Sequence, residues 1–66
     1  MPGTYKMTEI VGTSPVNFSE AVKSGVEEAV KAGHKIDWFE VVELRGRVKS
    51  GKVDEFQVTL KLGGKI

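Results

Sequence analysis

The sequence predicts an α+β protein with the element order β-α-β-β, in which a three-stranded antiparallel sheet packs against one helix. Three observations favour this fold class. Apolar and polar residues alternate near the start of the chain, a segment with helical spacing follows, and two further alternating segments are joined by a short turn. Because 66 residues fit a single domain, we expect one domain over residues 1–66.

The first strand is expected from Thr4 to Val11, where successive side chains point to opposite faces of a sheet. Tyr5 and Met7 share one of these faces. The segment Gly12-Thr13-Ser14-Pro15 then predicts a turn, because glycine and proline are typical turn residues.

The helix is expected to begin after Asn17, a good N-cap residue, with Glu20 three residues later as in a capping box. Small and apolar residues then recur at the spacing of one helix face, at Phe18, Ala21, Val22, Gly25, Val26, Ala29 and Val30. The helix should end near Ala32, with Gly33 as residue C′. Glycine in mid-helix costs about 1 kcal/mol relative to alanine, so we expect another backbone to pass close to Gly25.

The second and third strands are expected from about Ile36 to Val48 and from Val53 to about Leu62. The four residues between them, Lys49-Ser50-Gly51-Lys52, predict the turn of a long hairpin.

The third strand has one apolar face and one mixed face. The apolar face is formed by Phe56, Val58, Leu60 and Leu62, which Phe39 and Val41 of the second strand are expected to join. On the mixed face, Trp38, Val42 and Leu44 are expected beside Gln57. Because one helix covers only one face of a sheet, the mixed face should meet partner subunits, a ligand or both.

Composition argues against several classes of function. Ten Lys and Arg residues against nine Asp and Glu give a net charge of +1, and the charges are interspersed, so a nucleic-acid partner is not expected. No apolar segment is long enough for a membrane span or a signal-peptide core, so we expect no membrane partner and a cytoplasmic location. A single His, no Cys and no Gly-rich phosphate loop also make an enzyme an unfavoured interpretation.

A chain this short needs an additional source of stability. It buries only about 60% of the surface that its unfolded form exposes. With no Cys and one His, neither disulfides nor an ordinary zinc site can supply that stability. Oligomerisation remains as the expected source of additional stability.

The only tryptophan, Trp38, and the only glutamine, Gln57, are the strongest candidates for a binding site. An indole offers a face for stacking, and a primary amide offers an acceptor and two donors for the imide edge of a ring such as isoalloxazine. The competing interpretations are a tryptophan in a core or interface and a glutamine on solvated surface.

Two arginines of the second strand, Arg45 and Arg47, bracket Gly46 and share a face. They are expected either to pair across strands with Glu43 or Glu55, or to contact the phosphate tail of a ligand.

Five segments of the chain together resemble the dodecin family. They are Tyr5-Lys6, Val11-Gly12-Thr13-Ser14-Pro15, Asp37-Trp38-Phe39-Glu40-Val41, Arg45-Gly46 and Phe56-Gln57-Val58-Thr59. The similarity runs in register from about Thr4 to Gly63. It implies a β-α-β-β subunit whose sheet partly wraps its helix, and twelve copies that form a hollow sphere.

The resemblance also implies a flavin site. In that family, paired isoalloxazine rings stack on a tryptophan that matches Trp38 and accept hydrogen bonds from, or donate them to, a glutamine that matches Gln57. Asp37 and Arg45 match positions near the flavin, with Arg45 toward the ribityl or phosphate end. FMN is the favoured ligand, with riboflavin, FAD and lumichrome as alternatives, and the resemblance allows coenzyme A at a second site.

The chain departs from the family pattern at its end, which reads Gly63-Gly64-Lys65-Ile66 where relatives carry an aromatic and a basic residue followed by a short acidic tail. Gly64 has no side chain where relatives carry a bulky one. Lys65 offers a point charge in place of the forked guanidinium of an arginine. Weaker assembly, or a preference for flavins without phosphate, is the expected effect.

Two hypotheses of function follow. The first is a homododecamer that stores or sequesters free flavin and quenches its excited state, which protects against light. The second is an oligomeric scaffold without flavin, in which carboxylates such as Glu40 and Glu43, repeated around a symmetry axis, gather ions, or in which another small molecule binds.

Overall fold

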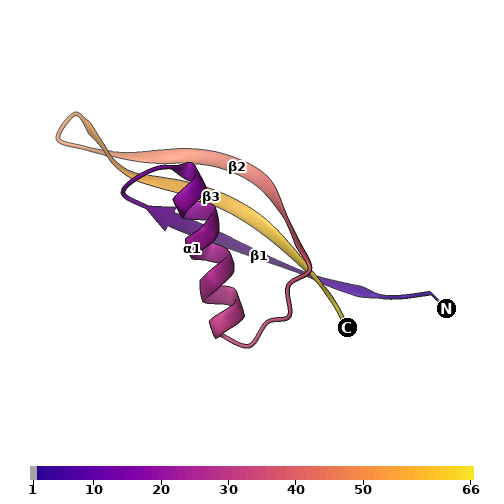
Figure 1. Ribbon diagram of the computed structural model, residues 1–66. Coiled ribbons are helices and arrows are strands. Elements are labelled where there is room, and N and C mark those ends of the chain that lie inside the picture. The colour runs from indigo at the N-terminus through magenta and orange to yellow at the C-terminus, as the bar shows by residue number, and fades with distance from the viewer. Residues whose placement is uncertain (1) are drawn as a thin grey trace.

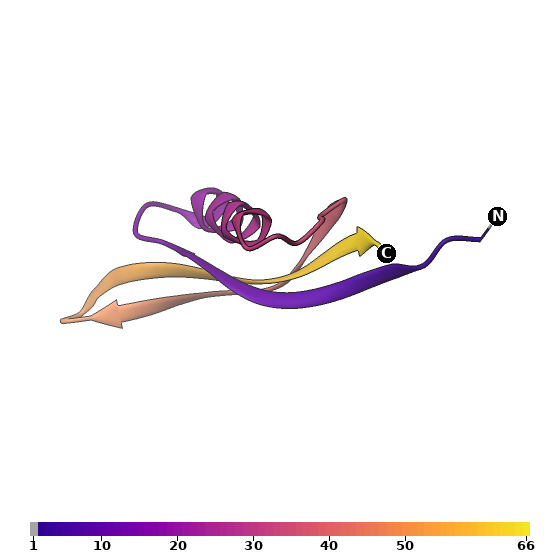
Figure 2. The same cartoon turned by 90° about the horizontal axis from the view of Figure 1, so that it is seen from below.

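The computed structural model describes residues 2–66 and has the four expected elements in the expected order (Figure 1). They are β1 (Tyr5–Ser14), α1 (Phe18–Lys31), β2 (Trp38–Lys49) and β3 (Lys52–Lys65). The strands form one antiparallel sheet in the order β1-β3-β2. Figure 2 shows that α1 lies on one side of this curved sheet, and the opposite side is called the outer face below. The predicted fold class is confirmed.

Both ends of α1 follow from local chemistry. The Asn17 side chain accepts a hydrogen bond from the Glu20 backbone N–H at 2.7 Å, which satisfies one of the free donors of the first turn. After the C-cap residue Ala32, Gly33 has a φ of 95°, a conformation that favours glycine. The predicted helix boundaries are confirmed.

The helix approaches β1 through two glycines. A Cβ atom on Gly25 would lie 3.2 Å from the Cα atom of Gly12, and a Cβ atom on Gly12 would overlap the carbonyl group of Ala21. The expectation of a backbone close to Gly25 is therefore confirmed. The turn predicted at Gly12 is wrong in its start, because β1 continues to Ser14 with Gly12 paired to Val58.

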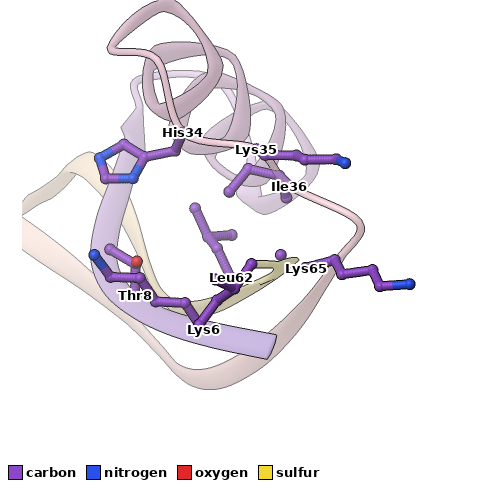
Figure 3. Close-up of a pocket in the computed structure, with 9 residues that line it drawn as sticks. Lys6, Thr8, His34, Lys35, Ile36, Leu62 and Lys65 are labelled. Atoms are coloured by element: carbon purple, nitrogen blue, oxygen red, sulfur yellow. The ribbon is translucent and has the colours of Figure 1, made fainter. Parts of the chain in front are cut away.

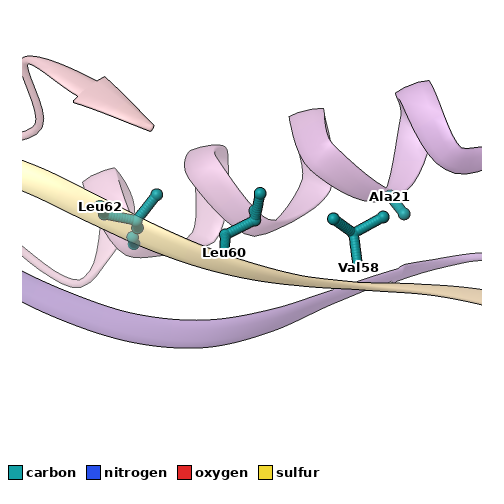
Figure 4. Packing of buried hydrophobic residues seen from close by; sticks show 5 residues of the cluster. Ala21, Val58, Leu60 and Leu62 are labelled. Carbon is teal, nitrogen blue, oxygen red and sulfur yellow. The ribbon is translucent and has the colours of Figure 1, made fainter. Parts of the chain in front are cut away.

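The core lies between α1 and β3. Val58, Leu60 and Leu62 are fully buried, and Ala21 and Ala29 of the helix close over them (Figure 4). The core side chains of the sheet come from β3 because it is the central strand, flanked on both sides, whereas β1 and β2 are edges.

The helix leaves β2 uncovered. On the helix side of that strand, Phe39, Val41 and Leu44 are 48–55% exposed. The radius of gyration is 13.6 Å, against about 11 Å for a compact chain of this length, and the chain measures 54 × 21 × 14 Å. One copy alone is thus an elongated plate with an apolar strip along one edge.

A β-bulge in β2 corrects the predicted faces. Val41 pairs with Leu60 and Glu43 pairs with Thr59, so Val42 is an extra residue on its strand. Because one added residue exchanges the two faces, Leu44 pairs with Val58 on the helix side. The expectation that Leu44 shares a face with Trp38 is wrong.

The hairpin and the end of β3 complete the sheet. Ser50 and Gly51 both have positive φ angles, of 53° and 74°, as a two-residue type I′ hairpin turn requires. Strand β3 runs to Lys65, three residues past its expected end, and the added residues pair with the start of β1. Gly64 is buried there against the Lys35 carbonyl group, where a Cβ atom would clash.

Candidate ligand-binding site

Trp38 is the first residue of β2 and lies opposite Gly63 of β3. Its six-membered ring covers Gly63 so closely that a Cβ atom there would overlap the indole. The Tyr5 ring of β1 meets the indole edge-to-face, with centroids 4.9 Å apart and an interplanar angle of 67°. Trp38 remains 37% exposed, so the outer face presents an aromatic surface at this end that is held by its neighbours and still accessible.

Asp37 fixes the start of β2 to the end of β3. Its backbone N–H donates to the Gly63 carbonyl at 2.7 Å, and its carboxylate accepts from the Lys65 backbone N–H at 2.9 Å. These two hydrogen bonds hold Asp37 in place, directly before Trp38. Within one chain, Asp37 therefore orients the strand that carries the indole.

Arg45 and Gln57 form a second, polar part of the outer face. They are paired across β2 and β3. The Arg45 guanidinium donates from Nη2 to Thr59 Oγ1 at 2.7 Å and also forms an ion pair with the Glu43 carboxylate. The Gln57 amide donates from Nε2 to Glu55 Oε1 at 2.9 Å. The predicted partner Glu43 is present, but the pair runs along β2 and not across strands, so the expected cross-strand geometry is wrong for Arg45.

Arg47 extends this polar row toward the hairpin. Its Nε and Nη2 atoms donate to Asp54 Oδ2 at 3.0 and 2.5 Å, and its Nη1 atom lies 4.0 Å from Glu55 Oε1. The hydrogen bond to Asp54, followed by the charges of Glu55 and Asp54, raises the pKa of Arg47 above its ordinary value. The expected pairing with Glu55 is present, but Asp54 is the closer partner.

One chain does not bring Trp38 beside Gln57. Trp38 lies opposite Gly63, whereas Gln57 lies opposite Arg45, six positions from Gly63 along β3. At about 3.3 Å per residue, the two side chains are roughly 20 Å apart on the same face. A single small ring that touches both residue types must therefore lie between two copies of the chain.

A cavity of about 220 Å³ lies on the helix side of the sheet, at the end where β3 finishes (Figure 3). Lys6, Lys35 and Lys65 line it together with His34, and the Leu62 side chain lies at its base. We call it the basic cavity. The sequence by itself indicates only Lys65, because the other cationic residues come from separate segments that only the fold brings together.

Sequence reasoning also missed Tyr5 and Glu55 as partners of Trp38 and Gln57. The spacing of Glu55 and Gln57 on one strand was a usable signal for the second pair. The first pair depends on the β1–β3 register, which local patterns do not encode. Among residues 2–66, no group of three or more His, Cys, Asp or Glu side chains lies close enough to hold a metal ion. No helix in that range is long and apolar enough to span a bilayer.

Comparison with known proteins gives a consistent result. The family model described as dodecin matches residues 4–66. A curated dodecin of Thermus thermophilus is 40% identical over 63 residues, which cover 96% of this chain and 91% of that protein. The solved dodecin of Streptomyces davaonensis superposes with a TM-score of 0.93 at 42% identity, covering 100% of this chain and 97% of that one.

A third relative has a ligand in its name. The calcium dodecin of Mycobacterium tuberculosis, described with a calcium-binding site, superposes with a TM-score of 0.83 at 30% identity, covering 96% of this chain and 90% of that one. The match over nearly the whole chain, in sequence and in fold, shows that this protein belongs to the dodecin family.

Proposed function

We propose that this protein binds free flavin, most favourably FMN, and stores it while quenching its excited state. The observation that carries this proposal is the setting of Trp38. Its indole is seated on Gly63, fixed at its edge by Tyr5, and still partly open on the outer face. A flat ring can stack on such a surface without first ordering the tryptophan.

The binding site would be assembled from more than one copy. Trp38 of one copy would stack on the ring, and Gln57 and Arg45 of another would meet its imide edge and its ribityl or phosphate end. The exposed apolar strip on β2 supports self-association, because Phe39, Val41 and Leu44 are left without cover in one chain. Twelve copies are the assembly that the family resemblance implies.

Quenching would be a physical process without turnover of a substrate. An indole in contact with a photoexcited flavin donates one electron to it, and the return of that electron restores both ground states. Two rings stacked between indoles leave little room for a substrate, so we propose a cytoplasmic storage protein and not an enzyme. Riboflavin, FAD and lumichrome carry the same ring system and are the alternative ligands.

The direct test follows flavin fluorescence while FMN is added to the apo protein, with the mass of the particle measured in the same solution. Quenching that saturates near one flavin per chain, in a particle of about twelve chains, is the expected result. A large particle that leaves the fluorescence unchanged would overturn the flavin proposal.

Gln57→Ala is expected to weaken flavin binding by roughly 1 to 3 kcal/mol, because the imide edge then loses a hydrogen-bond partner in a desolvated site. The fluorescence titration measures this loss. Glu28→Ala, on the exposed side of α1, is the control and should leave the affinity as it is. An affinity of Gln57→Ala equal to that of the control would contradict the hydrogen bond.

A second ligand is proposed for the basic cavity. Lys6, Lys35 and Lys65 are among the residues that line it, so a phosphate-bearing molecule such as coenzyme A would find cationic side chains nearby. Calorimetric titration with coenzyme A, with and without saturating FMN, tests this proposal. Binding that persists beside FMN would place the two ligands at separate sites.

The alternative function is an ion-binding scaffold without flavin. Glu40 and Glu43 of several copies, gathered around a symmetry axis, would supply carboxylate oxygens for a hard cation such as Ca²⁺. A colourless preparation that takes up no added flavin, yet binds calcium, would favour this function over the first.

A further inference from the structure

Glu55 stands beside Gln57 on the outer face. The two residues are separated by one position on β3, so strand geometry directs both side chains to the same side of the sheet. Gln57 Nε2 donates to Glu55 Oε1 at 2.9 Å, and the Glu55 side chain is only 24% exposed. A half-buried carboxylate thus accepts one of the two N–H groups of the amide.

This contact fixes which end of the amide faces Glu55. An ionised carboxylate has only acceptors, so it attracts the amide nitrogen and repels the amide oxygen. Rotating the amide by 180° would place two oxygen acceptors against each other. With Glu55 in place, Gln57 therefore presents its carbonyl oxygen and its remaining N–H to a ligand.

The surrounding charges keep Glu55 available for this role. Arg47 lies opposite it and supplies a positive charge at 4.0 Å, but the shorter contacts of Arg47 go to Asp54. On the other flank, the Arg45 guanidinium is engaged by Thr59 and Glu43. Neither arginine displaces the amide of Gln57 from the Glu55 carboxylate.

We propose that Glu55 is a positioning residue that makes the site selective for rings with an imide edge. Such an edge carries an N–H between two carbonyl groups. The carbonyl oxygen of Gln57 can accept from that N–H, and its remaining N–H can donate to a neighbouring carbonyl. Glu55 does not touch the ligand and acts through the orientation of Gln57. This inference rests on the proposed flavin function.

The test compares riboflavin with 3-methylriboflavin, in which a methyl group replaces the imide hydrogen. Fluorescence titration of the unaltered protein should give riboflavin an advantage of about tenfold or more, the size expected when a buried acceptor loses its donor. In Glu55→Ala the amide is free to rotate, and the advantage should fall to about threefold or less, as expected for the loss of one such contact. Circular dichroism and particle mass confirm that the variant is folded and assembled.

Two conservative variants separate geometry from charge. Glu55→Gln keeps the reach but carries donors as well as an acceptor, so either orientation of the Gln57 amide can pair with it, and the advantage should fall as in Glu55→Ala. Glu55→Asp keeps the charge but is one methylene shorter, so it should lose the advantage as Glu55→Ala does. This pair also decides the matter if Glu55→Ala does not fold.

The outcomes distinguish the two proposals. An undiminished advantage in Glu55→Ala or Glu55→Asp, with riboflavin still quenched, overturns the role of Glu55 alone. Quenching of neither flavin by the unaltered protein overturns the flavin function together with it.

Discussion

Trp38→Ala is expected to lower the affinity for FMN at least about a hundredfold, because burial of an indole of about 150 to 250 Å² against the ring is worth up to roughly 4 to 6 kcal/mol. Flavin fluorescence should return at the same time, since the electron donor is gone. Titration of the variant with FMN, read by fluorescence and by ultrafiltration of free flavin, measures both effects.

Trp38→Phe is the matched control for this change. It keeps an aromatic face over Gly63 but removes the indole, so affinity should fall less than in Trp38→Ala. Tyr5 should retain an edge-to-face partner in this variant. An unchanged affinity in Trp38→Ala would contradict the stacking model, whatever the fluorescence does.

Gly12→Ala is expected to destabilise the subunit by about 1 to 3 kcal/mol or more, the usual cost of forcing extra atoms into a packed contact. The new Cβ atom would overlap the Ala21 carbonyl, which belongs to rigid helical backbone. The helix must then move away from β1, and Gly25 loses its close contact. Thermal unfolding at a fixed protein concentration measures the loss.

Gly46→Ala makes the same chemical change in another strand and is the control. A Cβ atom there would approach only the Glu55 carbonyl oxygen, at 3.4 Å, which is an ordinary contact. Its melting temperature should stay within a few degrees of the unaltered protein, as a change well below 1 kcal/mol implies. Equal losses in both variants would show that glycine itself, and not the close approach at Gly12, matters.

Local signals were sufficient to predict the elements of the fold. Asn17 caps the helix with its own side chain, Gly33 ends it with a positive φ, and Ser50 and Gly51 close the hairpin. Each of these features depends on a few consecutive residues, so the sequence carries them directly. The separation of an apolar β3 face from a mixed one was also predictable, because alternation with period two is local.

The pairing of distant segments could not be predicted in the same way. The bulge at Val42 moved Leu44 to the helix side, and no residue type in that segment marks the extra position. Gly64 removes a bulky side chain from the end of β3, and this lack of a side chain lets the Lys35 carbonyl pass over the strand, which continues to Lys65. These outcomes depend on registers between strands, which are set by the whole sheet.

The candidate site was predicted by residue type and not by arrangement. The sequence singled out Trp38, Gln57, Arg45 and Asp37, and the structure places them all at the β2–β3 pair. It places Arg45 opposite Gln57 across the two strands, bonds Asp37 to the end of β3, and leaves the indole far from the amide. Once the pairing of β2 with β3 is known, the separation of Trp38 and Gln57 follows from counting residues along the strands.

The distance of roughly 20 Å between Trp38 and Gln57 along one sheet has a thermodynamic consequence. If one flavin bridges two copies, the affinity of the copies for each other and their affinity for flavin are linked, and each must raise the other by the same factor. Flavin would then act as a cross-link in the particle that carries it. In a cell short of flavin the particles would be less stable as well as empty, so the supply of flavin would also set how long the assembled particle persists.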